Sequence, residues 1–112
     1  MEVISTLNKL KEAMDSVRGS CSSDSLTLCS ALKEKVGGSL YYYKPLKSRD
    51  LFDGRGFTTV HYYLHKIVDG RHYVLDPVNG YFNYEEVYDE WFRRMNAGIP
   101  ISSVHVMHSK VG

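Results

Sequence analysis

A β-hairpin signal in the middle of the sequence limits the folds open to this chain more than any other feature. Residues 58–68 are rich in Thr, Val, Tyr, Leu and Ile, which favour strands. Asp69-Gly70 follows, a dipeptide typical of a two-residue hairpin turn. Residues 71–76 read as the return strand, which Pro77 ends. We therefore expect a fold built around an antiparallel sheet.

Helical and strand-like periodicities place further elements on both sides of this hairpin. Gly37-Gly38 stops the second helix, and Pro45 closes the strand that follows it. A length of 112 residues fits one domain with one core, over residues 1–112. We predict an α+β fold in which two N-terminal helices pack on a small antiparallel β-sheet with one further helix. The expected elements are helices over 3–17, 22–36 and 84–95, strands over 39–43 and 101–107, and a loop over 46–57.

Charge and hydropathy narrow the range of partners. The net charge is +1, whereas a nucleic-acid binder of this size usually carries a larger basic excess. The basic residues Lys44, Lys47, Arg49 and Arg55 are scattered through a loop. Nucleic acid is therefore disfavoured as a partner. No apolar run is long enough to span a membrane, and the N-terminus lacks the pattern of a secretory signal, although the domain could form the tail of a larger exported protein.

The two cysteines differ in their expected environment. Cys29 lies on the apolar line of the second helix and reads as a small buried hydrophobe. Cys21 lies at or next to the start of that helix, where the helix N-terminus lowers a thiol pKa and makes the thiolate more accessible. We expect no disulfide between them, and no metal or cofactor, because neither cysteine has a close Cys or His pair beside it. Cys21 is the candidate nucleophile, and a partly buried structural thiol is the alternative.

The hairpin register brings two histidines near one carboxylate. If Asp69-Gly70 forms the turn, Tyr63 faces Asp76, and strand alternation puts His61 and His65 on the same face as Asp76. Asp76 is then a diagonal neighbour of both, so the register alone does not choose between them. A carboxylate in this position can orient an imidazole as a general base. The alternative role is a His–Asp hydrogen bond that only stabilises the hairpin.

The order of these motifs is similar to that of the papain-like and transglutaminase-like superfamily. The relevant segments are Gly19-Ser20-Cys21 before a helix, Val60-His61-Tyr62-Tyr63-Leu64 opening a strand, and the Asp69-Gly70 turn leading to Leu75-Asp76-Pro77. His61 precedes Asp76 by 76 − 61 = 15 positions, a spacing such folds commonly show, which favours His61 over His65. Over residues 19–80 the chain looks most like the papain-fold toxin domains of bacterial polymorphic, contact-dependent inhibition systems.

This resemblance implies a papain-like fold with a Cys21-His61-Asp76 triad. The implied activity is that of a cysteine hydrolase, amidase or deamidase acting on a protein or another amide-bearing substrate. The implied biology is a toxin domain, delivered to the cytoplasm of a target cell from a larger secreted protein and neutralised by an immunity protein. One departure stands out: the papain pattern has a Gln upstream of the nucleophile to build the oxyanion hole, and this sequence has no Gln.

Two other functions remain open on the sequence. A ribonuclease toxin on the same scaffold would use His61, His65, Tyr63 and Lys66 for general acid–base cleavage, with Cys21 dispensable. A non-enzymatic binding module would instead present its tyrosine-rich segments, 41–43 and 81–84, to a partner. An acidic helix, with Glu85, Glu86, Asp89 and Glu90, reads as a solvated face or as an immunity-protein contact.

Overall fold

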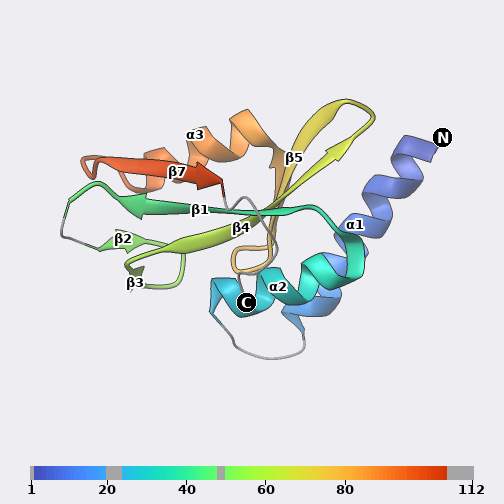
Figure 1. Ribbon diagram of the computed structural model, residues 1–112, viewed down its shortest axis with the longest axis horizontal. Helices are drawn as coiled ribbons and strands as arrows, with labels where there is room; N and C mark the ends of the chain where they lie inside the picture. Colours follow the sequence, from blue (N-terminus) through green and yellow to red (C-terminus); the bar gives the residue numbers. More distant parts are fainter. Residues whose placement is uncertain (1, 20–23, 48–49, 106–112) are drawn as a thin grey trace.

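The computed structural model describes residues 2–19, 24–47 and 50–105 and has an α+β architecture (Figure 1). Its main sheet has five strands in the order β6-β5-β4-β1-β7, and every pairing is antiparallel. A separate two-stranded sheet joins β2 to β3. The elements are α1 (Glu2–Arg18), α2 (Ser25–Val36), β1 (Ser39–Pro45), β2 (Leu51–Phe52), β3 (Phe57–Thr58), β4 (His61–Val68), β5 (Arg71–Asp76), β6 (Tyr81–Tyr84), α3 (Glu85–Met95) and β7 (Ile101–His105).

The predicted hairpin is present in the predicted register. Val68 pairs with Arg71 and Leu64 with Leu75, and the turn residues Asp69 and Gly70 both have positive φ, as a tight two-residue turn requires. Side chains one residue apart on β4 therefore point to opposite faces of the sheet, as the alternation requires. This register decides which residues can meet across the hairpin.

The sheet separates two hydrophobic cores. On one face α1 and α2 pack against the sheet, with Met14, Leu32 and Leu64 fully buried between them. On the other face α3 packs through Tyr88 and Phe92 against Tyr43, in an aromatic cluster. Figure 1 shows α1 and α2 on one side of the strands and α3 on the opposite side. The predicted arrangement of two N-terminal helices on an antiparallel sheet with one further helix is confirmed.

Several boundaries differ from the sequence prediction. The strand expected over 58–68 begins only at His61 as β4, because Thr58 pairs with Leu51 in β3. The second helix does not extend from residue 22: Asp24 has extended backbone angles and its side chain accepts a hydrogen bond from Thr27 N at 2.8 Å, so it caps a helix that begins at Ser25. The expected loop over 46–57 contains β2 and most of a short hairpin. Residues 81–83, to which no element was assigned, and Tyr84, expected as the first residue of the third helix, form β6 at the edge of the sheet and pair with β5.

Within the described residues, no helix combines the length and apolar character needed to cross a lipid bilayer.

Candidate functional site

A buried histidine–aspartate hydrogen bond links the start of β4 to the end of β5. His61 Nε2 lies 2.9 Å from Asp76 Oδ2, and both side chains are completely inaccessible to solvent. Alternation along the two strands brings the two residues to the same face of the hairpin, as the sequence predicts. Of the two histidines that the register left open, His61 is the one that contacts Asp76.

Asp76 is held by donors from three directions. The Asp76 carboxylate accepts hydrogen bonds from the backbone N–H of Val78 at 3.0 Å and of Asn79 at 3.2 Å, from Asn79 Nδ2 at 2.9 Å and from the Tyr88 hydroxyl at 2.7 Å. Burial alone would raise the pKa of Asp76, but His61 and the hydrogen bonds from His61, Asn79 and Tyr88 outweigh it and hold the pKa below its ordinary value. Asp76 is therefore a carboxylate at neutral pH.

This charge state fixes the tautomer of His61. A carboxylate can only accept hydrogen bonds, so His61 Nε2 carries the proton and neutral His61 keeps its lone pair on Nδ1. The ring stacks on Phe92, with centroids 5.2 Å apart and planes at 15°. Nδ1 is buried and has no hydrogen-bond partner among the described residues. A buried polar atom without a partner is rare and costly, and it is a feature of sites that hold a group for chemistry.

The nucleophile named by the sequence, Cys21, lies outside the described residues. The start of α2 lies beside the β4 backbone one residue from His61, because Ser25 Oγ accepts a hydrogen bond from Tyr62 N at 2.9 Å. The His61 ring itself lies on the α3 side, against Phe92. Cys29 is fully buried, and its Sγ contacts Tyr62 O at 3.4 Å. Burial, with a smaller contribution from the charge of Asp76, raises the pKa of the Cys29 thiol well above its ordinary value. Cys29 is thus a structural residue, as predicted.

A surface groove of about 570 Å³ lies next to the segment that follows Asp76 of the His61–Asp76 pair. Gly19 at the end of α1 lies on one wall, and Pro77 and Val78, which follow Asp76 directly, lie on another. Its charged lining comes from Asp15, Arg18 and Arg55. The groove therefore joins the end of α1 to the loop that carries the Asp76 donors.

His65, the alternative base, belongs to a different cluster. His65 Nε2 lies 2.9 Å from His72 Nδ1 and 3.8 Å from Glu85 Oε2, and the ring stacks on Tyr41 with centroids 4.6 Å apart. Within the described part of the chain, His65, His72 and Glu85 form the one group of three potential metal-ligating side chains whose ligand atoms lie within 4.8 Å of one another.

Of the residues considered for ribonuclease chemistry, Lys66 lies apart from His61, Tyr63 and His65. Lys66 donates a hydrogen bond to the carbonyl of Val36 at the end of α2, on the opposite face of the sheet from His65. Tyr63 is buried in the α3 core beside Tyr43 and Tyr88. Lys66 therefore does not share a site with the two histidines.

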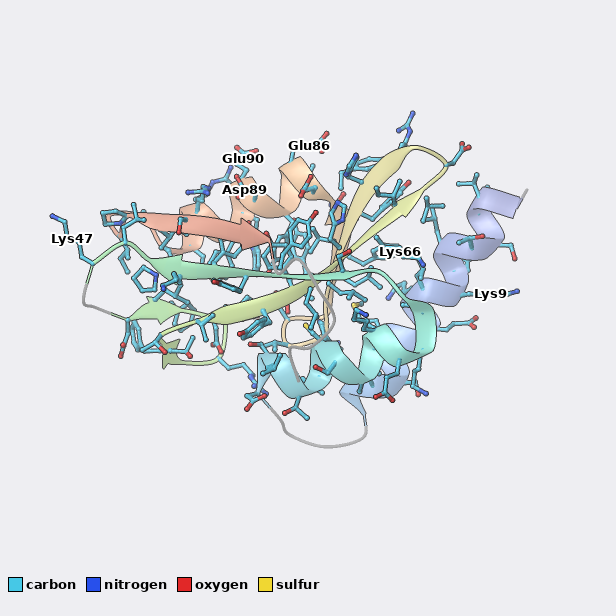
Figure 2. All side chains as sticks on the ribbon, in the orientation of Figure 1. Lys9, Lys47, Lys66, Glu86, Asp89 and Glu90 are labelled. Atoms are coloured by element: carbon cyan, nitrogen blue, oxygen red, sulfur yellow. The ribbon has the colours of Figure 1, made fainter. Side chains whose placement is uncertain are left out.

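The tyrosine-rich segments and the acidic helix are largely engaged within the fold. Tyr43 is buried and donates to Asp89 at 2.8 Å, and Tyr81 stacks on Trp91 with centroids 4.5 Å apart. Figure 2 shows Glu86, Asp89 and Glu90 along α3, on the side of the sheet away from α1 and α2. Asp89 and Glu90 form ion pairs with Arg93 and Arg94, one turn further along α3, at 3.0 and 2.7 Å.

Sequence reasoning missed two residues that hold Asp76. Tyr88 was not singled out within the predicted third helix, and nothing in its spacing connects it to the hairpin. Asn79 had a weak signal, since an Asp followed three residues later by an Asn and a Gly is typical of a side-chain-stabilised turn. Gly54, at the tip of the β2–β3 hairpin, packs against this Asn79: a Cβ at position 54 would lie 1.7 Å from Asn79 Oδ1.

Comparison with known proteins identifies no relative: no family model, curated protein or solved structure gives a match for this chain.

Proposed function

We propose that this protein is a cysteine-dependent hydrolase or deamidase in which Cys21, His61 and Asp76 act as a triad. The observation that carries the proposal is the His61–Asp76 pair. The pair fixes the imidazole through Nε2 at 2.9 Å and leaves a buried Nδ1 without a partner among the described residues. An oriented imidazole with one free nitrogen is what a thiol nucleophile needs as its base.

The proposal requires Cys21 to reach this nitrogen from the segment that precedes α2. The hydrogen bond between Ser25 and Tyr62 fixes one end of that segment at the β4 backbone, one residue from His61. Four peptide links connect Cys21 to Ser25, and an extended chain spans roughly 13 Å over that length. Since α2 begins only at Ser25, the thiol depends on His61 for activation more than on the helix N-terminus.

The proposed reaction follows from the atoms present. Nδ1 of His61 accepts the thiol proton, and the thiolate attacks the substrate carbonyl carbon to form a C–S bond. The C–N bond breaks as the leaving amine or ammonia takes the proton from Nδ1. Water then attacks the thioester and gives a proton to Nδ1, the carboxylic acid leaves, and the proton returns to sulfur. Asp76 stays ionised throughout and holds the ring through Nε2.

The first test measures the reactivity of the thiol, because it needs no substrate. We expect iodoacetamide to alkylate Cys21 rapidly below pH 7, where an ordinary thiol is mostly protonated, as followed by mass spectrometry of the intact and digested protein. His61→Gln should slow this alkylation at least about tenfold, because a thiolate–imidazolium pair supplies most of the reactive form. His72→Gln, which changes a histidine outside the pair, should leave the rate unchanged.

Folding of the variants is checked by circular dichroism before rates are compared. If His61→Gln does not fold, the pH profile of wild-type alkylation still decides. A profile that follows an ordinary thiol, with a midpoint near pH 8.5, would exclude the activated cysteine. So would a Cys21 that reacts equally fast in wild type and in a folded His61→Gln.

The second test addresses the toxin role that the resemblance implies. Expression in a bacterial cytoplasm should arrest growth, and Cys21→Ser should relieve the arrest at equal protein level. A second gene that restores growth by binding the protein would be the immunity partner. Equal toxicity of wild type and Cys21→Ser would contradict the cysteine mechanism.

A further inference from the structure

We propose that His65, His72 and Glu85 form a binding site for a divalent transition-metal ion of the zinc type. This site shares no residue with the proposed triad and does not depend on it. Imidazole nitrogens and a carboxylate oxygen are preferred ligands of Zn²⁺, and two histidines with one glutamate make a ligand set that leaves a position open for water or substrate.

The sheet itself brings the three ligands together. His65 pairs with Val74 in the β4–β5 register, and His72 lies two residues from Val74 on the same face. Tyr84 pairs with Tyr73 in the next register, so Glu85, the following residue, comes beside His72. The three side chains thus form a row across adjacent elements, and the positions depend on backbone pairing rather than on a loop.

The distances between ligand atoms are close to those of a metal site. Two ligands of a tetrahedral zinc ion lie about 3.3 Å apart, given bonds of about 2.0–2.1 Å. Here His65 Nε2 lies 2.9 Å from His72 Nδ1 and 3.8 Å from Glu85 Oε2, and His72 Nδ1 lies 4.0 Å from Glu85 Oε1. The two glutamate distances run to different oxygens of the Glu85 carboxylate, and with one ligand atom from each residue the three atoms lie within 4.8 Å of one another. Rotations of the exposed His72 and Glu85 side chains would bring the three atoms to the spacing of one ion.

The environment combines a fixed ligand with an open side. The His65 side chain is 6% exposed and its ring is stacked on Tyr41, so its orientation is set before binding. His72 and Glu85 are 52% and 37% exposed and line a surface groove of about 360 Å³. An ion bound to this row would have its remaining coordination positions directed to the groove.

Neighbouring charges do not oppose a cation strongly. Glu86 adds a second carboxylate to the lining of the groove. Arg71 contributes the opposing charge, and its guanidinium donates to the Tyr84 hydroxyl at 3.0 Å. Without metal, one of the two facing nitrogens, His65 Nε2 or His72 Nδ1, carries the proton of the hydrogen bond seen here; an ion would need the lone pairs of both, with the ring protons on the outer nitrogens.

The test is a Zn²⁺ titration of the chelator-treated protein, followed by calorimetry and by competition with a chromophoric chelator. Cys21→Ser serves as the background throughout, so that its thiol cannot act as a ligand. We expect one ion per chain, and a visible absorption band of tetrahedral type when Co²⁺ replaces Zn²⁺. His72→Ala and Glu85→Gln should each weaken binding at least about tenfold. Glu90→Gln, one turn further along α3 and exposed, is the matched control and should bind as the background does.

His65→Ala is not used, because this buried ring packs in the fold and its loss could unfold the protein. His72 and Glu85 reach the surface, so their variants are expected to keep the wild-type circular dichroism spectrum. Absence of a stoichiometric Zn²⁺ site in the background protein would overturn the proposal. Equal affinity in the background, His72→Ala and Glu85→Gln would also overturn it, since the ion would then be bound elsewhere.

Discussion

The carboxylate of Asp76, the last residue of β5, accepts several hydrogen bonds that the pairing of its strand does not require. Its donors come from the β5–β6 turn, from β4 and from α3, and together they make a buried charge tolerable. Tyr88 is the donor from outside the hairpin. We assign Tyr88 the role of a positioning residue, because its hydroxyl touches the carboxylate and not the imidazole.

Tyr88→Phe tests that role. Loss of a 2.7 Å hydrogen bond to a buried carboxylate should lower the free energy of unfolding by about 1.5–3 kcal/mol, measured by urea titration. It should also slow Cys21 alkylation at low pH, an effect that a purely structural hydroxyl would not have. Tyr43→Phe removes a comparable hydroxyl, bonded to Asp89, and should leave the alkylation rate unchanged. Equal alkylation rates in the two variants would argue against positioning by Tyr88.

The lowered pKa of Asp76 predicts how stability depends on pH. Because the folded-state pKa lies below the ordinary value of 3.8, Asp76 stabilises the fold fully above that value. The contribution is lost as the pH falls through the folded-state pKa. Urea titrations between pH 7 and pH 2 should therefore give a flatter profile for Asp76→Asn than for wild type in the acid region. Parallel profiles would show that Asp76 does not titrate below its ordinary range.

At the scale of elements, the small β2–β3 hairpin supports the His61–Asp76 pair from a distance. Asn79 bridges the two, since its Nδ2 donates to Asp53 O and to Asp76 Oδ2, both at 2.9 Å. Gly54 has φ of +105° and lies against the Asn79 amide, so this position accepts only glycine without a shift. The hairpin is also tied to α3 through Asn96, which accepts from Phe52 N at 2.7 Å.

Gly54→Ala should therefore damage the site, whereas Gly56→Ala should not. A Cβ at position 54 would lie 1.7 Å from Asn79 Oδ1, whereas one at position 56 meets nothing within 4 Å. We expect Gly54→Ala to lower the free energy of unfolding by about 1–3 kcal/mol and to raise the acid midpoint of unfolding, through loss of the Asn79 hydrogen bond to Asp76. Gly56→Ala should stay within about 0.5 kcal/mol of wild type. A reversed order would mean that Asn79 moves aside freely.

Prediction from sequence succeeded where the signal was local. The turn Asp69-Gly70 set the β4–β5 register, and that register alone placed His61 near Asp76. It failed where a contact joins distant segments. No sequence spacing predicts the contact between Glu85 and His65. It depends on the pairing of β6 with β5, and β6 lies in a tyrosine-rich segment that was not predicted as a strand. The helix start was misplaced because Ser22, Ser23 and Asp24 are all good caps, and only the bond to Thr27 N identifies Asp24.

At the scale of the whole molecule, one sheet is shared by two cores. Leu64 and Leu75 face α1 and α2, while Tyr63 and Val74, their neighbours along the strands, face α3. A substitution that destabilises one core therefore also destabilises the strands on which the other core packs. We expect both cores to unfold in a single cooperative transition.

Met14→Ala provides the test. Met14 is fully buried on the α1 side, and its truncation should cost about 2–5 kcal/mol. Trp91, the chain's one tryptophan, lies on the α3 side and reports on the other core. Fluorescence of Trp91 and far-ultraviolet circular dichroism should shift to the same lower urea midpoint. Ile4→Ala, at an exposed position of the same helix, should leave both unchanged. Separate midpoints for the two probes would show that the cores unfold independently.

Cys29 is completely enclosed between α2 and β4, so its thiol reacts with an added reagent only when this part of the fold opens. When the reagent modifies the exposed thiol faster than the helix closes again, the rate of modification equals the rate of opening. The modification rate is then independent of the reagent concentration. After Cys21 has been blocked, the rate at which Cys29 is labelled therefore measures the opening rate of the α1–α2 layer under native conditions, without denaturant.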